Sequence, residues 1–356
     1  MINLYLSHKL KALSFLLIVF VVFLHSKNLE INIGSSSETI SEGYNTYIQY
    51  VISDGITRIA VPLFFMISGF LFFFGVNSFS LNTYKTKIYK RIKTLLVPYL
   101  FWTTFTILFY YILQSFPFSK PFFTKGLIRE YSYVDYILRI LINPLPYQFW
   151  FIRDLMLLVL ISPLLFFGIK KIKLVVISLL LYTWFFEFDY IILSNESLLF
   201  FTLGSVFGIY KSPLEIKHYK QWVIILTSIW ALLILLKSYF YFNTELSTLI
   251  RILHKMSIVV GVVWIWVFYD FFYRQIDISK TRTFNLFKFT FFIFAFHEPI
   301  LTISKKLFYS LIGQTELSSL LIYIFTPILV ILIAVCVAYT LNKILPKFYK
   351  LITGNR

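Results

Sequence analysis

Two histidines stand inside apolar runs of this sequence, and their type and setting suit them to chemistry. His25 ends the run LKALSFLLIVFVVFLHS (10–26), and His297 is followed by Glu298 and a proline inside FAFHEPIL (294–301). An imidazole can exchange a proton near neutral pH, and a neighbouring carboxylate can orient it. Ionisable groups are costly within a bilayer unless they face protein or water, so both positions are candidates for a functional site.

Three further charged residues lie near the starts of apolar runs. They are Arg58, Arg153 and Asp154. Each has a structural alternative, because Arg58 can extend to lipid headgroups and the other two can pair with neighbouring helices. Left unpaired at the membrane centre, each Arg or Asp would cost about 2.5–3.5 kcal/mol. A shared, partly wet cavity would offset these costs, so we predict that the three residues gather with His25 and the His-Glu pair.

The helices that must position these residues are predicted by composition. Of the 356 residues, 59% are hydrophobic and only 14% are charged, well below the charge of a water-soluble domain. The net charge of +17 comes from short basic clusters between apolar runs, which argues against a nucleic-acid-binding domain. The single Cys336 excludes an internal disulfide framework and a multi-cysteine metal site, and we expect no metal.

Ten apolar segments are predicted to form transmembrane helices in one all-α bundle, a single membrane domain over residues 1–356 with no appended soluble domain. They lie at about 10–26, 57–75, 94–115, 148–168, 172–188, 196–210, 221–237, 256–273, 284–304 and 317–342. The sixth holds Gly204 and Gly208 at the small-xxx-small spacing that lets helix backbones pack closely. The first segment has no cleavage site after it, so we expect it to be retained.

The basic residues predict the orientation of this bundle. With the N-terminus in the cytoplasm, the inner connections hold 20 Lys and Arg and the outer ones hold 10. This bias follows the positive-inside rule, and it predicts cytoplasmic termini in a multi-pass protein of the inner (cytoplasmic) membrane. The longest connections, about 27–56 and 116–147, then fall outside, as do the ends of the helices that carry the two histidines.

A dense basic stretch, KTKIYKRIKTLLVPY (85–99), precedes the third segment on the inner side. Its lysines and arginine can anchor the chain to anionic lipid and enforce the topology. They also suit a polyphosphate ligand such as a nucleotide-bearing cofactor, with Lys90, Arg91 and Lys93 as the binding residues. Both interpretations remain open at this point.

Six segments in order resemble the membrane acyltransferase-3 family. The first helix ends in FLHS; TRIAVPLFFMISGFLFF (57–73), KRIKTLLVPY (90–99), QFWFIRDL (148–155), FTLGSVFGIY (201–210) and FAFHEPIL (294–301) follow. No single segment is specific, but six spread over nearly the whole chain are.

The family typically has an arginine eleven residues before the histidine of the first helix, about 16 Å away on the same face. Here that position is Ser14, which is a departure from the family pattern. Lys11 lies about 40° from the face of His25 and could supply the cation from one turn lower. The donor-binding contact is therefore expected at Lys11 and Ser14.

The resemblance implies transfer of an acyl group, commonly acetyl from acetyl-CoA, to a hydroxyl of a cell-surface or lipid-linked polysaccharide. His25 would be the general base, or would carry the acyl group transiently. Arg58 or Arg153 would stabilise the oxyanion, and His297 and Glu298 would orient the acceptor or tune the base. Expected partners are acyl-CoA, a glycan acceptor and membrane lipid, with a second copy of the chain left open.

Two other functions remain compatible with the same residues. One is a transporter or flippase for a lipid-linked glycan, which would use the polar cavity as a passage, although no inverted repeat is visible in the sequence. The other is a structural or sensory membrane protein whose charges only hold the bundle together. Labelled acetyl-CoA distinguishes the first, because a flippase leaves the glycan unlabelled.

Overall fold

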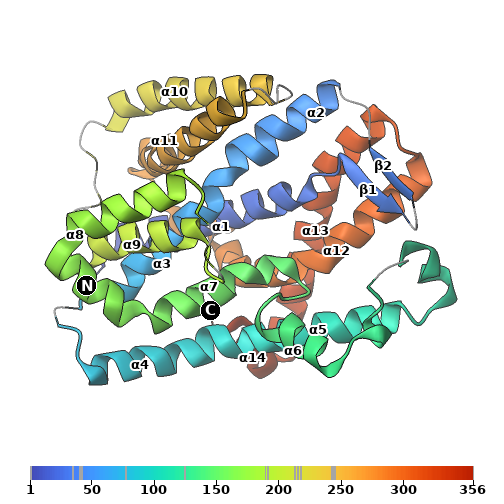
Figure 1. Ribbon diagram of the computed structural model, residues 1–356, viewed down its shortest axis with the longest axis horizontal. Coiled ribbons are helices and arrows are strands. Elements are labelled where there is room, and N and C mark those ends of the chain that lie inside the picture. The colour runs from blue at the N-terminus through green and yellow to red at the C-terminus, as the bar shows by residue number, and fades with distance from the viewer. Residues whose placement is uncertain are drawn as a thin grey trace. The chain divides into compact units, whose positions relative to one another are not determined.

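The computed structural model is built almost entirely of helices (Figure 1). It describes residues 2–33, 36–39, 43–76, 78–123, 126–188, 190, 192–211, 214, 216, 219–241 and 246–355. Within these ranges, seven helices are long and apolar enough to cross a membrane, and an eighth span results if one bent pair is counted. The prediction of a helical, multi-pass membrane protein is thereby confirmed.

The difference between eight spans and ten predicted segments has two local causes. The fourth and fifth segments correspond to the bent pair, Tyr147–Leu160 and Ser162–Phe185, which meet at an angle of 62°. The helix Ser162–Phe185 itself leaves helical geometry at Ile172 (φ −136°, ψ 44°), which is where the fifth predicted segment starts. The sixth segment is the helix Asn195–Ile209, which is apolar but shorter than a full span.

Contacts between Cα atoms divide the chain into two compact units, which are described separately. The first contains Met1–Leu24, Tyr50–Ile88 and Leu157–Thr290, and the second contains His25–Gln49, Tyr89–Met156 and Phe291–Arg356. A single membrane domain over residues 1–356 stays a prediction.

The first unit combines long apolar helices with several short ones. They are α1 (Leu4–Ser26, whose last two residues belong to the second unit), η1 (Tyr50–Gly55), η2 (Ile56–Ile59), α3 (Ala60–Phe73), α4 (Leu81–Arg91, whose last three residues belong to the second unit), α8 (Ser162–Phe185), α9 (Asn195–Ile209), α10 (Tyr219–Phe240), α11 (Ser247–Tyr273), η8 (Ile278–Lys280) and η9 (Arg282–Phe289). Helices α10 and α11 lie side by side (Figure 1). Helix α9 packs along both α3 and α8.

The α3–α9 contact depends on glycine. A Cβ atom on Gly204 would lie 1.9 Å from the carbonyl oxygen of Met66, and one on Gly208 would lie 2.6 Å from that of Phe70. Any larger side chain would push the two backbones apart. The close packing predicted from the spacing of these glycines is confirmed.

The second unit combines long helices with short elements. They are β1 (Glu30–Ile33), β2 (Ser36–Thr39), α2 (Tyr44–Gln49), η3 (Ile92–Leu96), α5 (Val97–Leu113), η4 (Pro117–Phe122), η5 (Ile128–Glu130), α6 (Tyr133–Leu141), η6 (Tyr147–Phe149), α7 (Trp150–Leu160, whose last four residues belong to the first unit), α12 (Thr290–Ile312, whose first residue belongs to the first unit), α13 (Glu316–Ile344) and α14 (Pro346–Thr353). Strands β1 and β2 pair antiparallel, a small departure from the all-α prediction. Helix α13 packs on α2, and α14 packs on α5.

A buried cluster of polar side chains joins the chain after α1 to α2 and α13. The Nε2 atom of Gln49 donates to Asn28 Oδ1 at 2.7 Å and to Asn45 Oδ1 at 2.8 Å. Ser319 Oγ accepts from Asn45 Nδ2 and donates to Asn28 Oδ1, each at 2.9 Å. Because these residues are polar, the hydropathy of the sequence placed the start of the second span near residue 57. The span begins at Tyr44. Their hydrogen bonds hold the backbone that directly follows His25.

Candidate functional site

Helix α12 is broken where the sequence places Pro299. Proline has no N–H to give the carbonyl of Ala295, and Glu298 before it adopts extended angles (φ −105°, ψ 135°). Gln148 Nε2 donates to the freed carbonyls of Ala295 and Glu298, at 3.5 and 3.4 Å. The second half of the helix then starts with proline at its first position, which is favourable there. The break holds His297 and Glu298, both buried, at a junction between two half-helices.

His25 and His297 meet at this junction. The Nδ1 atom of His25 lies 3.0 Å from Nε2 of His297, and the two rings stack with centroids 5.3 Å apart. Tyr147 packs edge-on against His25, with ring centroids 4.8 Å apart. The structure therefore brings together the two histidines that the sequence singled out.

The hydrogen bonds of His297 define which nitrogen carries each proton. Nδ1 of His297 lies 3.2 Å from the carbonyl oxygen of Ile293, which can only accept, so this nitrogen is the donor. In neutral His297 the Nε2 atom then accepts, and Nδ1–H of His25 donates to it. The basic lone pair of His25 is consequently on Nε2. An imidazole oriented through one nitrogen with the other basic is the arrangement of a general base.

Glu298 is held by hydroxyl groups from two segments. The hydroxyl of Tyr147 donates to Oε1 at 3.0 Å, and so does the hydroxyl of Thr302, also at 3.0 Å. The backbone N–H of Thr302 donates to Oε2 at 3.4 Å, so the carboxyl group also caps the second half-helix. Because Tyr147 contacts both His25 and Glu298, it links the carboxyl group to the histidine pair.

Lys305 is a site residue that the sequence did not single out. Its Nζ atom donates to the carbonyl oxygen of His25 at 2.7 Å and to that of Lys27 at 3.3 Å. A cation at the C-terminal end of a helix binds its unpaired carbonyls and complements its dipole. Lys305 follows Glu298 by about two turns of the same half-helix. In the sequence, its role could have been indicated only by its spacing of about two turns from Glu298, on a helix that Pro299 breaks.

Arg153 and Asp154 form an ion pair in the same unit. The Nη2 atom of Arg153 lies 2.8 Å from Asp154 Oδ1, and Nη1 donates to the carbonyl oxygen of Ile142 at 2.6 Å. Asp154 is fully buried, and the Arg153 side chain is 15% exposed. The pair holds the start of α7 against the segment that follows α6.

Arg58 belongs to the other unit. Its Nη2 atom lies 3.0 Å from Asp54 Oδ1 one turn earlier, and its side chain is 43% exposed. This ion pair is local to one helical stretch. The gathering of Arg58 with the two histidines, and its alternative extension to lipid headgroups, both stay predictions.

The predicted donor-binding residues divide between the units. Lys11 and Ser14 lie on α1 in the first unit; Lys11 is exposed, with its ammonium 5.6 Å from the centre of the Phe284 ring. The buried cation of that helix is Lys9 instead. Its Nζ atom lies 2.7 Å from Asp270 Oδ1 and 3.9 Å from the centre of the Trp266 indole.

Lys90, Arg91 and Lys93 lie in the second unit, at the junction of α4 with η3. Lys90 and Lys93 are exposed and Arg91 is partly buried. The ammonium of Lys93 lies 4.6 Å from the centre of the Tyr89 ring. Two of the three cations are therefore open to a ligand from outside the chain.

A family model described as an acyltransferase domain matches residues 8–341. The chain belongs to the acyltransferase-3 family. It is also 26% identical over 361 residues to the succinoglycan biosynthesis protein ExoH of Rhizobium meliloti (strain 1021), with 98% of this chain and 92% of that protein covered. No solved structure matches the chain.

Membership of the acyltransferase-3 family confirms what the six sequence segments indicated. The match reaches from α1 to α13, so it includes both histidines and the broken helix between Glu298 and Pro299. The chain is therefore a multi-pass membrane protein of an acyltransferase family.

Proposed function

We propose that this protein is an integral-membrane O-acyltransferase with His25 as its general base. It would transfer acetyl from cytoplasmic acetyl-CoA, or another acyl group from its CoA thioester, to a hydroxyl of a cell-surface or lipid-linked polysaccharide. The observation that carries the proposal is the hydrogen-bonded series Ile293 O, His297 and His25, which leaves the basic lone pair on Nε2 of His25. The relative named for succinoglycan biosynthesis supports a glycan as the acceptor.

The proposed step conserves atoms and charge. Nε2 of His25 takes the proton of the acceptor hydroxyl while the hydroxyl oxygen bonds to the thioester carbonyl carbon. The C–S bond then breaks, and the CoA thiolate recovers the proton from the imidazolium. His297 accepts from Nδ1–H throughout, which holds the ring in place and stabilises its charged form. An acyl group carried on His25 itself remains the alternative route.

Charged residues supply the remaining roles in this proposal. Arg58 or Arg153 would stabilise the oxyanion, and Arg58 has the more exposed guanidinium of the two. His297 and Glu298 hold the base, while Asp154 fixes Arg153. The CoA phosphates would bind the residues named from the sequence: Lys90, Arg91, Lys93, Lys11 and Ser14.

The membrane arrangement completes the proposal. We propose about ten membrane-crossing segments in one domain, with both termini cytoplasmic and the protein in the inner membrane. The support is the basic bias of the connections that this orientation places inside. The polysaccharide would then reach His25 from the outer side, where α1 ends.

Reconstituted protein tests the proposal. The full chain in lipid vesicles, supplied with acetyl-labelled CoA and a surface polysaccharide fraction, should incorporate label into base-labile esters on the glycan. His25→Ala should abolish this incorporation, whereas His8→Gln, a histidine change elsewhere on α1, should preserve it. A transporter would move the glycan and leave it unlabelled, and that outcome would refute the enzyme assignment.

A further inference from the structure

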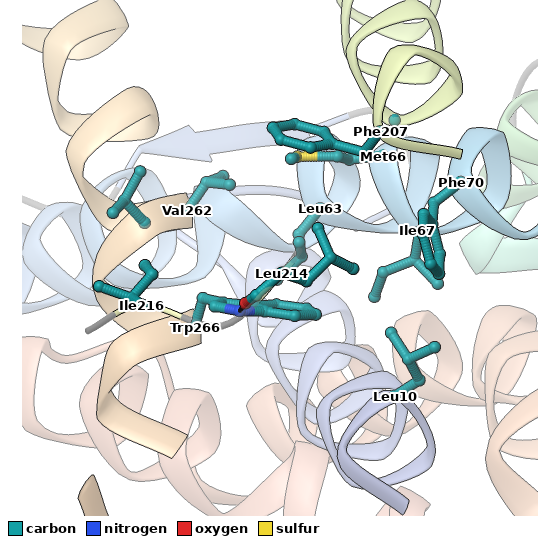
Figure 2. Close-up of a pocket in the computed structure, with 12 residues that line it drawn as sticks. Leu10, Leu63, Met66, Ile67, Phe70, Phe207, Leu214, Ile216, Val262 and Trp266 are labelled. Carbon is teal, nitrogen blue, oxygen red and sulfur yellow. Dashed lines mark hydrogen bonds between the residues drawn. The ribbon is translucent and has the colours of Figure 1, made fainter. Parts of the chain in front are cut away.

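Apolar side chains border open space in both units. In the first unit they line a cavity of about 170 Å³, with walls from α1, α3, α9 and α11 (Figure 2). In the second unit they form one face of α6, which consists of Val134, Ile137, Leu138 and Leu141. These four side chains are between 39% and 63% exposed and follow the i, i+3, i+4, i+7 spacing of an amphipathic helix. An exposed apolar face of this kind marks an interaction surface.

Hydrogen bonds at two levels show that α6 runs beside α5 in the opposite direction. The N–H of Ile128, which precedes α6, donates to Oε1 of Gln114 at the end of α5, at 2.8 Å. The hydroxyl of Tyr99, in the first turn of α5, donates to the carbonyl oxygen of Leu141 at 3.4 Å. Along a helix, Tyr99 and Gln114 are about 22 Å apart, which is most of the roughly 30 Å thickness of the hydrocarbon core. Because α5 belongs to a helix long and apolar enough to cross a membrane, the path of α6 follows it into the bilayer.

The inner end of α6 has donors for its carbonyl groups. Besides the bond from Tyr99, Nη1 of Arg153 donates to the carbonyl oxygen of Ile142 at 2.6 Å. No water pairs such groups in hydrocarbon, so a helix that ends there needs donors from the protein. Pro144 and Pro146 stop the helix, and the chain becomes helical again at η6 and α7.

The two charged residues of α6 fit the same position. Asp135 completes the capping box with Ser132 in the first turn, which lies at the membrane surface. Arg139 directs its guanidinium back toward the start of the helix, where its Cζ atom lies 6.0 Å from the centre of the Tyr131 ring. A long cationic side chain near the surface of a membrane places its charge among the headgroups in this way.

We propose that α6 and α7 are two halves of one membrane span, broken at residues 142–149, and that the apolar face of α6 contacts the hydrocarbon chains of the surrounding lipid. Lipid is the occupant because α6 packs directly on α5. The exposed side chains of α5, which include Phe105, Leu108 and Ile112, belong to a membrane-crossing helix and face the same solvent.

This arrangement places two broken helices at the candidate site. Gln148, in the break between α6 and α7, donates to the carbonyl oxygens of Ala295 and Glu298, in the break of α12. The outer connection that the sequence placed at 116–147 would then end where α6 begins. The proposal does not depend on acyl transfer, since it concerns the position of α6 in the bilayer.

Spin labels measure the depth of α6. Cysteines are introduced singly at Val134, Ile137 and Leu141 in the full-length protein carrying Cys336→Ser, and each labelled variant is reconstituted in lipid vesicles. Collisions of the label with oxygen, which concentrates in hydrocarbon, are compared with collisions with a water-soluble nickel chelate. The ratio of oxygen to nickel collisions should rise from Val134→Cys through Ile137→Cys to Leu141→Cys, because position 141 lies about 10 Å deeper than position 134.

Three other outcomes of this measurement would each overturn the proposal. A high ratio that is equal at positions 134 and 141 would place α6 flat on the membrane. A low ratio at all three positions would place it in water. Few collisions with either reagent would show that a partner protein or a second copy of the chain covers the face.

A charge placed on the same face gives a second test without a label. Leu141→Lys puts an ammonium group at the deep end of α6, so it should lower the unfolding midpoint of the full-length protein in nanodiscs. Tyr133→Lys is the matched control, because Tyr133 is 90% exposed at the outer end of the same helix, and it should leave the midpoint unchanged. Equal midpoints for the two variants would contradict a membrane position for α6.

Discussion

Nδ1 of His25 lies 3.0 Å from Nε2 of His297, although 272 residues separate them in the chain. The first of these residues ends an unbroken helix, and the second stands just before a proline break. The end of α1 and the break in α12 come from distant parts of the sequence and meet within one compact unit. The proposed catalysis depends on this contact.

Replacing His297 tests the orienting role. His297→Phe keeps an aromatic ring but removes the acceptor for Nδ1–H of His25, so kcat should fall on the order of 10²-fold with little change in KM. His297→Gln retains a side-chain acceptor, so its kcat should fall less than that of His297→Phe. Steady-state transfer rates for the two variants provide the measurement. Equal losses would show that the ring fills space and does not orient the base.

Lys305 should act as a positioning residue through the end of α1. Lys305→Met removes a charged donor from the carbonyls of His25 and Lys27, worth about 1.5–3 kcal/mol, so kcat should fall roughly 10- to 100-fold. Lys305→Arg should restore most of the rate, and Lys306→Met serves as the neighbouring control. If arginine fails to rescue while both variants melt like the wild type, the positioning role is wrong.

The buried pair of Lys9 and Asp270 should stabilise the first unit. Their side chains are 2% and 3% exposed, and removing one partner of such a pair typically costs about 3–5 kcal/mol. Lys9→Met should therefore lower the unfolding midpoint in detergent. Lys9→Met combined with Asp270→Leu should recover much of the loss, since no charge is then left unpaired. A double variant no better than Lys9→Met would contradict this explanation.

The start of α6 should respond to pH. Hydrogen bonds from Ser132 lower the pKa of Asp135, which closes the capping box of this helix. A carboxyl group whose pKa is lowered by folding stabilises the folded state at pH values above its unfolded pKa. This stabilisation is lost as the pH falls through the lowered pKa. Hydrogen exchange at residues 133–136, corrected for its intrinsic pH dependence, should accelerate in acid for the wild type. Asp135→Asn should show no such pH effect.

The sequence allowed much of the candidate site to be anticipated. Counting basic residues predicted that His25 lies at the outer end of its helix and His297 past the middle of another helix that runs outward. The structure places the two side chains in contact. The spacing of Gly204 and Gly208 correctly indicated close backbone packing. These features depend on local patterns, the helical period and the charge bias, which a single sequence carries.

Other features depend on tertiary contacts that local patterns do not encode. Lys305 resembled an ordinary outer-side cation until its carbonyl partners were seen. Helical phase indicated Lys11 as the cation near the face of His25, but it did not indicate that Lys9 is buried, which depends on its contacts with Asp270 and Trp266. Gln49 looked like a loop residue, since polar side chains that bind one another inside a bundle lower the apparent hydropathy of a true helix.

The most direct measurement of the central claim is mass spectrometry of ester-linked acyl groups on glycan treated with the reconstituted protein and acetyl-CoA. The wild type and His8→Gln should both add acyl groups, and His25→Ala should add none while keeping the same fold and lipid binding. Undiminished acylation by His25→Ala would contradict the account, because the base that it assigns would then be unnecessary.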